Sequence, residues 1–232
     1  MPLKRSGKAA EDRVFNAVLD AILDHRLAPG TRLGERDLSE LLHASRGAVR
    51  AALARLGHGL LVELRPNRGA VIANPTAAER RDVFEARRIV EAAIVQALAR
   101  GVGAKKLAEL RAFVAEEQKA YDRGDRKTGQ RLSIRFHKVL AEMAGNAVLD
   151  RFMGELISRT PLLVLAHRGS PLAYCGAGEH REIVDALARR DPALALRRMN
   201  AHLGRLESQL RVEEEPQPQG LSAALGALET SK

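Results

Sequence analysis

Apolar residues recur every three or four positions in three segments of the first sixty residues, which is the spacing of an amphipathic helix. The first segment ends at "APG", because proline and glycine continue a helix poorly. Ser45 precedes the third segment and is a suitable N-cap for it. The apolar positions are Phe15, Val18, Leu19, Ile22 and Leu23 in the first segment, Leu38, Leu41 and Leu42 in the second, and Val49, Leu53 and Leu56 in the third.

Two short apolar runs follow the third helical segment. "LLVEL" and "GAVIA" have the length and composition of strands, and "RPNRG" between them favours a turn. Three helices followed by a β-hairpin form a winged helix-turn-helix, which we expect over residues 1–75. The first residues, "MPLKRSGKAAEDR", are basic and lack an apolar core for secretion, so we expect a mobile N-terminal arm there.

From residue 76 onward the pattern is almost wholly helical. Glycine, asparagine and proline punctuate it at "RGVGA", "DRGD", "AGNAV", "RGSPL" and "RRDPA". We predict helices over residues 76–100, 104–123, 125–144, 147–167, 173–190 and 192–212. The expected fold class is therefore mainly α, an N-terminal winged helix-turn-helix plus a C-terminal all-α helical bundle over 76–212. The acidic tail 213–232, with its proline, glutamine and glycine, is typical of poorly ordered chain.

Charge and cysteine content narrow the possible partners and compartments. The chain has 38 Lys and Arg against 29 Asp and Glu, a net charge of +9, which suits a polyanionic partner although soluble basic surfaces are common. A single cysteine excludes an internal disulfide framework and a cysteine-based zinc cluster. It agrees with a reducing, cytoplasmic location, and no apolar run is long enough to span a membrane.

The third predicted helix carries Arg46 and Arg50 one turn apart, opposite its apolar face. A recognition helix presents its N-terminal side chains to the major groove, and arginine is suited to bidentate contact with guanine. Ser45 and the amides at the helix start can bind a phosphate, and the hairpin turn can bring Arg65 and Arg68 to a phosphate or the minor groove. Solvated arginines on an ordinary helical hairpin are the alternative. The turn, helix and charged wing together favour duplex DNA.

The stretch "ILDHRLAPGTRLGERDLSELLHASRGAVRAALARLGHGLLVELRPNRGAVI" resembles the head of the GntR family of bacterial transcription regulators. His43 replaces the usual turn glycine, so the turn is strained or needs a positive φ. Gly47 and Ala48 stand where the family usually has Thr-Pro, so we expect a base preference that differs from that of relatives. The resemblance implies DNA contacts at Arg36, Ser45, Arg46 and Arg50, with Arg68 and Gly69 in the wing.

Three of the seven histidines, His137, His180 and His202, interrupt otherwise apolar faces of the predicted helices. If these helices pack into one bundle, the three imidazoles can converge on one divalent cation such as zinc or nickel. Histidines this far apart in sequence are also commonly unrelated core or surface residues. The spacing alone leaves both interpretations open.

The segments "FHKVLAEMAGNAVL", "EHREIVDALARRDPALA" and "MNAHL" are similar to the helical, FCD-type effector domain of the FadR-like branch of the same family. The resemblance implies a metal held by three histidines and an Asp or Asn, with a small carboxylate effector nearby. His137, His180 and His202 match the histidines, but Ser133 stands at the carboxylate position. A hydroxyl is a poorer ligand, so the site holds metal loosely, completes its ligand set with water or effector, or is metal-free.

Arg87 matches an arginine that faces the effector cavity in such domains, so with Ser133 it is an expected effector contact. A guanidinium can bind a carboxylate through two parallel hydrogen bonds. The alternative is that Arg87 pairs with Glu91 or Glu85 on the helix surface.

These features predict a ligand-responsive transcription regulator, not an enzyme. The resemblance implies a repressor that binds a palindromic operator as a homodimer, with a small carboxylate as its effector. A rival interpretation is a metal-dependent hydrolase in which the three histidines hold an activated water, although no obvious general base accompanies them. A third is an architectural DNA-binding protein whose bundle is purely structural.

Overall fold

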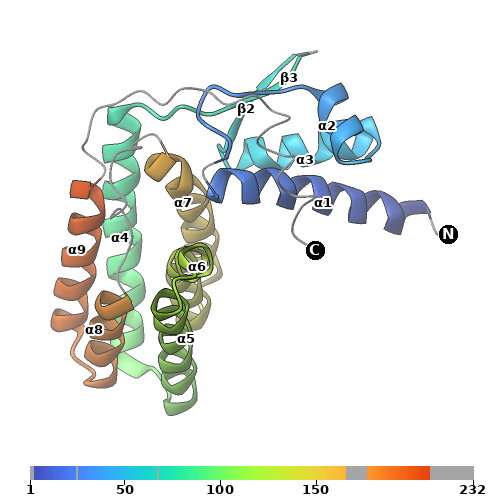
Figure 1. Ribbon diagram of the computed structural model, residues 1–232. Helices are drawn as coiled ribbons and strands as arrows, with labels where there is room; N and C mark the ends of the chain where they lie inside the picture. Colours follow the sequence, from blue (N-terminus) through green and yellow to red (C-terminus); the bar gives the residue numbers. More distant parts are fainter. Residues whose placement is uncertain (1–2, 25, 67, 166–176, 210–232) are drawn as a thin grey trace. The chain divides into compact units, whose positions relative to one another are not determined.

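The structure is a computed structural model that describes residues 3–24, 26–66, 68–165 and 177–209 of the chain. The chain forms two compact units, of which the first contains Met1–Pro75 and the second begins at Thr76 (Figure 1). Each unit has its own hydrophobic core. Within the described part, no helix has the length and apolar character needed to cross a membrane.

The N-terminal unit is a helix-turn-helix with a small sheet. The order is α1 (Leu3–Leu23), β1 (Arg32–Leu33), α2 (Glu35–Leu41), α3 (Arg46–His58), β2 (Val62–Arg65) and β3 (Gly69–Ile72). The strands pair antiparallel in the order β1-β3-β2. The structure therefore confirms the predicted helices and hairpin. Strand β1 was not predicted, because two residues are too few to show an alternating pattern.

The prediction of a mobile N-terminal arm was wrong, because α1 begins at Leu3. The segment contains several lysine, arginine and alanine residues, which favour helices. Val14, Val18 and Ile22 are fully buried in the core of the unit. Once this packing stabilises the later turns, adding turns on the N-terminal side costs little.

An N-cap explains where α3 begins, and the position of its apolar face explains which side of it is exposed to solvent. The Ser45 hydroxyl accepts a hydrogen bond from the Ala48 amide at 3.3 Å, which confirms the predicted N-cap. His43 in the preceding turn has a φ of 46°, as its replacement of a turn glycine predicts. The apolar face of α3 is buried and packs on α1. Its opposite face, with Arg46 and Arg50, is left to solvent.

The C-terminal unit is built from helices, in the order that the sequence predicts. They are α4 (Ala77–Gly101), α5 (Ala104–Asp122), α6 (Arg126–Ala144), α7 (Ala147–Leu165), α8 (Ala177–Ala188) and α9 (Pro192–Gln209). A capping box between Thr76 and Glu79 starts α4, and Pro192 occupies the first turn of α9. The predicted residues 166–167, 173–176 and 210–212 and the tail 213–232 lie outside the described residues.

Helix α4 packs against α6, α8 and α9, and α5 packs against α6 and α8 (Figure 1). Apolar side chains such as Phe136, Ile183 and Met199 fill the interior between these helices. Charged and polar side chains interrupt this core, although burying such groups is costly unless they are paired. Those with almost no solvent exposure are Arg87, Glu91, Glu117, Ser133, His137, Thr160, His180 and His202.

Candidate metal centre and nucleic-acid interface

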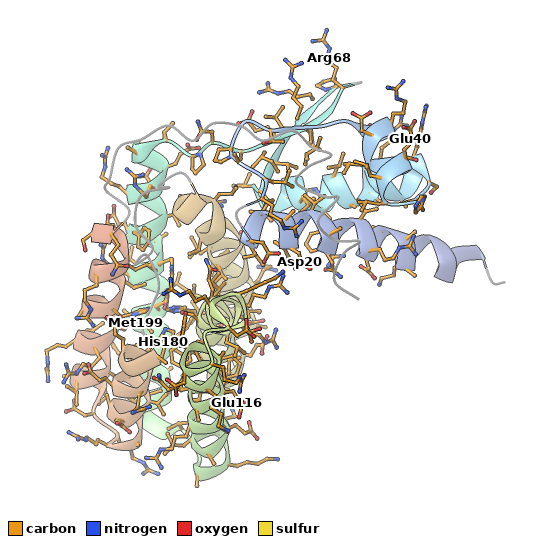
Figure 2. All side chains as sticks on the ribbon, viewed as in Figure 1. Asp20, Glu40, Arg68, Glu116, His180 and Met199 are labelled. Atoms are coloured by element: carbon orange, nitrogen blue, oxygen red, sulfur yellow. The ribbon has the colours of Figure 1, made fainter. Side chains whose placement is uncertain are left out.

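The three predicted histidines meet in the core of the C-terminal unit. His137 comes from α6, His180 from α8 and His202 from α9, and all three are buried. One ring nitrogen of each lies within 4.8 Å of those of the other two. Figure 2 shows His180 amid the helices of this unit. The structure therefore brings together residues that are far apart in the sequence.

Each of these histidines is held by a glutamate from another part of the unit. The Nδ1 atoms lie 2.5 Å from Glu91 for His137, 2.7 Å from Glu117 for His180 and 2.6 Å from Glu179 for His202. A carboxylate only accepts hydrogen bonds, so each Nδ1 carries a proton, and a neutral imidazole then has its lone pair at Nε2, where a metal can bind. This is the arrangement that orients imidazoles as metal ligands.

The donor set fits a divalent cation. The Nε2 atoms of His137 and His202 are 3.3 Å apart, so their lone pairs repel unless a cation or a proton lies between them. Two nitrogens bound to one tetrahedral zinc ion lie about 3.3 Å apart. The buried Ser133 hydroxyl, one turn before His137, has no hydrogen-bond partner among the described residues. It can serve as a weak neutral ligand or leave a coordination position open.

Arg87 joins this cluster through Glu91. Both side chains are almost fully buried, at 1% and 2% exposure, and the Arg87 Nε donates to Glu91 Oε1 at 2.8 Å. Arg87 also donates to Thr160 Oγ1 at 3.4 Å. The Arg87–Glu91 pair that the sequence left as the alternative is therefore present, but in the interior and not on the helix surface. Glu91 contacts Arg87 with one oxygen and His137 with the other.

Charges and hydrogen bonds in this cluster lower the pKa of two of its carboxyl groups, Glu91 and Glu179. Burial by itself would raise the pKa of Glu91, but the charges and hydrogen bonds of Arg87 and His137 outweigh it and lower that pKa to about 2. Partial burial likewise opposes ionisation of Glu179, but hydrogen bonds from His202 and Arg205 lower its pKa below the usual value. Glu91 is therefore a permanent buried anion near neutral pH.

The predicted DNA-contact residues lie on the surface of the N-terminal unit. Arg36 on α2 is 74% exposed and Arg50 on α3 is 68% exposed, and Arg46 and Ser45 are also exposed. The Arg50 Nε donates to Glu35 at 2.7 Å. Arg46 has no acidic partner among the described residues.

Arg55, further along α3, does not belong to this surface. It forms an ion pair with Asp12 at 2.7 Å and lies over the ring of Phe15, 3.8 Å from its centroid, so α1 holds it. The exposed arginines of α3 that form no ion pair with α1 are therefore Arg46 and Arg50, in its first two turns.

The wing residues Arg65, Arg68 and Gly69 differ in what holds them. Arg65 donates to Glu63 at 2.7 Å, whereas Arg68 is exposed and has no acidic partner in the described chain. Gly69 is buried with a φ of 80°, and a Cβ there would lie 2.2 Å from the carbonyl oxygen of Leu33. The backbone of the wing therefore requires glycine at this position, whether or not it contacts DNA.

Comparison with known protein families finds a matching family for each of the two units. Residues 82–205 match the FCD domain, and residues 10–72 match the bacterial regulatory proteins of the gntR family. The chain is a GntR-family transcription regulator with an FCD domain. This GntR–FCD regulator is 25% identical over 202 residues to the HTH-type transcriptional repressor RspR of Escherichia coli K12, covering 86% of this chain and 88% of RspR. It is 27% identical over 230 residues to the HTH-type transcriptional repressor NanR of Salmonella schwarzengrund, covering 87% of this chain and 84% of NanR.

Solved structures share the fold of the GntR–FCD regulator. A GntR transcriptional regulator from Rhodococcus sp. RHA1 is 28% identical with a TM-score of 0.72, over 87% of this chain and 97% of that one. E. coli McbR/YncC has a TM-score of 0.74 at 19% identity, over 87% and 96%, which shows a common fold.

The carboxylates of this GntR–FCD regulator are the site residues that the sequence analysis missed. Glu117 and Glu179 were not singled out, and Glu91 was considered only as a surface partner of Arg87. Glu117 and Glu91 interrupt helices whose neighbouring buried positions are mostly apolar, and this was the available signal. The sequence could not predict which histidine each glutamate contacts, because the partners are 46 positions apart for Glu91 and 63 positions apart for Glu117.

Proposed function

We propose that this GntR–FCD regulator is a repressor that binds a palindromic operator as a homodimer and responds to a small carboxylate in its C-terminal unit. The exposed pair Arg46 and Arg50, at the capped start of α3, is the observation that carries the proposal. The relatives RspR and NanR, which are repressors, support the direction of regulation. Exposed apolar residues one turn apart on α7, Val148 and Phe152, support self-association.

In this proposal α3 enters the major groove with its first two turns against the bases. Glu35 accepts from the Nε of Arg50, so both terminal nitrogens of that guanidinium can address O6 and N7 of one guanine. Ser45, the first amides of α3 and Arg36 bind the flanking phosphates. Arg65, Arg68 and Gly69 of the wing contact an adjacent phosphate or the minor groove.

Replacing Arg46 or Arg50 with alanine is expected to weaken operator binding by about 1–3 kcal/mol and to relax sequence preference, because each removes a bidentate base contact. Fluorescence anisotropy with a duplex selected by the full chain from a random library measures this. Arg55→Ala is the matched control on the same helix, since Arg55 is held by Asp12. Equal affinities for all three variants and the wild type would remove α3 from the interface.

In the C-terminal unit, Arg87 would bind the carboxylate effector. His137, His180 and His202 would hold a divalent cation of the zinc or nickel type, with Ser133 at the fourth position. The cation would supply a fixed positive charge for the same effector. A coupling free energy of about 1–3 kcal/mol between effector and DNA is the usual size of such regulation. A hydrolase would need a free general base, but the glutamates next to the histidines are engaged at Nδ1.

Ser133→Asp is expected to increase zinc affinity tenfold or more, because a carboxylate adds negative charge and a stronger oxygen ligand. Competition with a chromogenic chelator gives the dissociation constants, and circular dichroism verifies folding. Ser208→Asp on α9, at an exposed position, is the control for the added charge. If neither wild type nor Ser133→Asp binds zinc more tightly than His202→Ala, the histidines do not form a metal site.

A further inference from the structure

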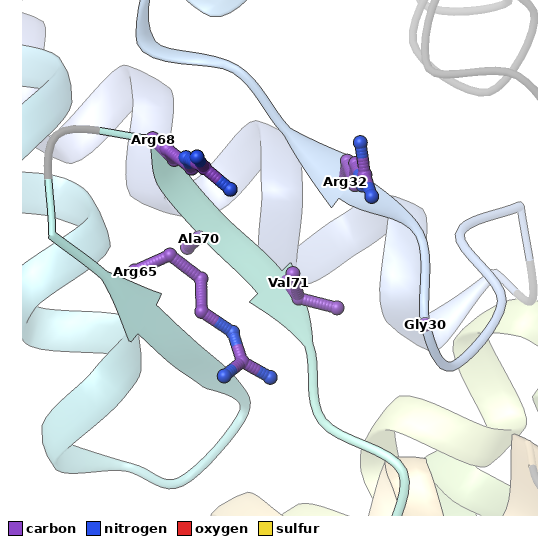
Figure 3. A pocket seen from close by; sticks show the side chains of 6 residues that line it. All are labelled: Gly30, Arg32, Arg65, Arg68, Ala70 and Val71. Atoms are coloured by element: carbon purple, nitrogen blue, oxygen red, sulfur yellow. The ribbon is translucent and has the colours of Figure 1, made fainter.

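The outer face of the wing sheet carries a groove that extends beyond the proposed DNA contacts Arg65 and Arg68. Its volume is about 640 Å³, and its lining residues are Gly30, Arg32, Arg65, Arg68, Ala70 and Val71 (Figure 3). The three arginines come from different parts of the sheet. Arg32 belongs to β1, Arg65 ends β2, and Arg68 directly precedes β3.

Strand register explains why these side chains share one face. Arg32 on β1 and Glu63 on β2 both pair with Val71, so these three residues lie side by side across the sheet. Arg65 follows Glu63 by two positions and therefore lies on the same face. Leu33 and Ile72, one position from Arg32 and Val71, are buried on the other face. The central strand β3 is thus flanked by arginines from both edge strands, as Figure 3 shows.

The groove has an excess of positive charge without internal compensation. Only Arg65 has an acidic partner, Glu63, among the described residues of this face. Arg32 and Arg68 are exposed and have no acidic partner in the described part of the chain. Neither arginine supports the hydrophobic core, so their positions fit an anionic ligand.

The position of the groove favours a nucleic-acid backbone as that ligand. Arg65 and Arg68, which line the groove, are themselves predicted DNA contacts, and Figure 2 shows Arg68 at the wing of the N-terminal unit. The groove therefore adjoins the predicted DNA surface. We infer that Arg32, with Arg65 and Arg68, binds phosphates of the duplex that flanks the bases read by α3. This inference rests on the proposed function and adds Arg32 to it.

The test compares two duplexes, the site selected by the full chain and the same site extended by about one helical turn on each side. Arg32→Gln is expected to weaken binding to the extended duplex three- to tenfold at low salt, and to lower the slope of log K against log salt by about 1 per protomer. Base preference and binding to the short duplex should stay the same. Arg100→Gln, an exposed change of equal charge on α4, should leave the slope unchanged.

The outcomes separate this inference from the proposed function. An unchanged slope for Arg32→Gln, with lost binding for Arg46→Ala, overturns the role of Arg32 and leaves α3 as the DNA reader. If neither Arg32→Gln nor Arg46→Ala weakens DNA binding, the proposed function itself is overturned. A free anion is the other source of phosphate, so inorganic phosphate is added to the DNA-free protein. One possible result is that phosphate raises the melting temperature of the wild type but not of Arg32→Gln, while the slope of log K against log salt stays unchanged. That result would assign the groove to a free anion and overturn the inference that it binds duplex DNA.

Discussion

Replacing Arg87 with methionine is expected to lower the free energy of unfolding of the C-terminal unit by about 3–5 kcal/mol. Methionine fills most of the volume, so the loss comes from the charge and not from a cavity. It leaves the ionised Glu91 buried, at 2% exposure, without its guanidinium partner. Urea unfolding followed by circular dichroism measures the loss, which corresponds to a fall in melting temperature on the order of 10 °C.

The neighbouring residue supplies the control. Arg88 also pairs with a glutamate, Glu207, but it is 35% exposed, so Arg88→Met should cost less than about 1 kcal/mol. In Arg87→Met/Glu91→Gln the buried charge is removed while an acceptor for His137 remains, and much of the lost stability should return. Equal losses for Arg87→Met and Arg88→Met would show that the buried pair contributes no more than a surface one.

Gly69→Ala is expected to destabilise the N-terminal unit by about 3 kcal/mol. Alanine is strained at a φ of 80°, and its Cβ would lie 2.2 Å from the carbonyl oxygen of Leu33, which is backbone of the paired strand β1. Relief of this contact requires β1 and β3 to separate. Thermal unfolding of the purified variant measures the loss, and DNA binding is compared well below its melting temperature.

Gly30→Ala separates the two causes. Gly30 has nearly the same φ, 81°, but a Cβ there would meet no atom within 4 Å. Its replacement should therefore cost only the backbone strain of about 1–2 kcal/mol. If Gly69→Ala is no more harmful than Gly30→Ala, the close approach to Leu33 does not constrain the wing.

The buried cluster also connects the two halves of the proposed effector site. Glu91 contacts both Arg87 and His137, so a carboxylate that binds Arg87 competes with Glu91 for the guanidinium. Any change at Arg87 therefore reaches the histidine that would hold the cation. This link is a property of three side chains on two helices, α4 and α6.

Local features of the chain account for the parts of the site that could be predicted. The exposed placement of Arg46 follows from the apolar spacing of Val49, Leu53 and Leu56, which decides the buried side of α3. The positive φ of His43 follows from its position in the turn. The site on α3 was predictable because its geometry depends on residues within about one helix of each other.

The sequence by itself determined the order of the helices, most of their boundaries other than the start of α1, the hairpin and the exposed arginines, because caps, turns and periodicity act over a few residues. Only the tertiary structure decided which glutamate holds which histidine, that Arg87 and Glu91 pair in the interior, and that Arg32 joins the wing arginines. Those contacts arise where separate helices or strands pack together. The distance between two side chains there depends on how those elements pack and not on their separation along the chain.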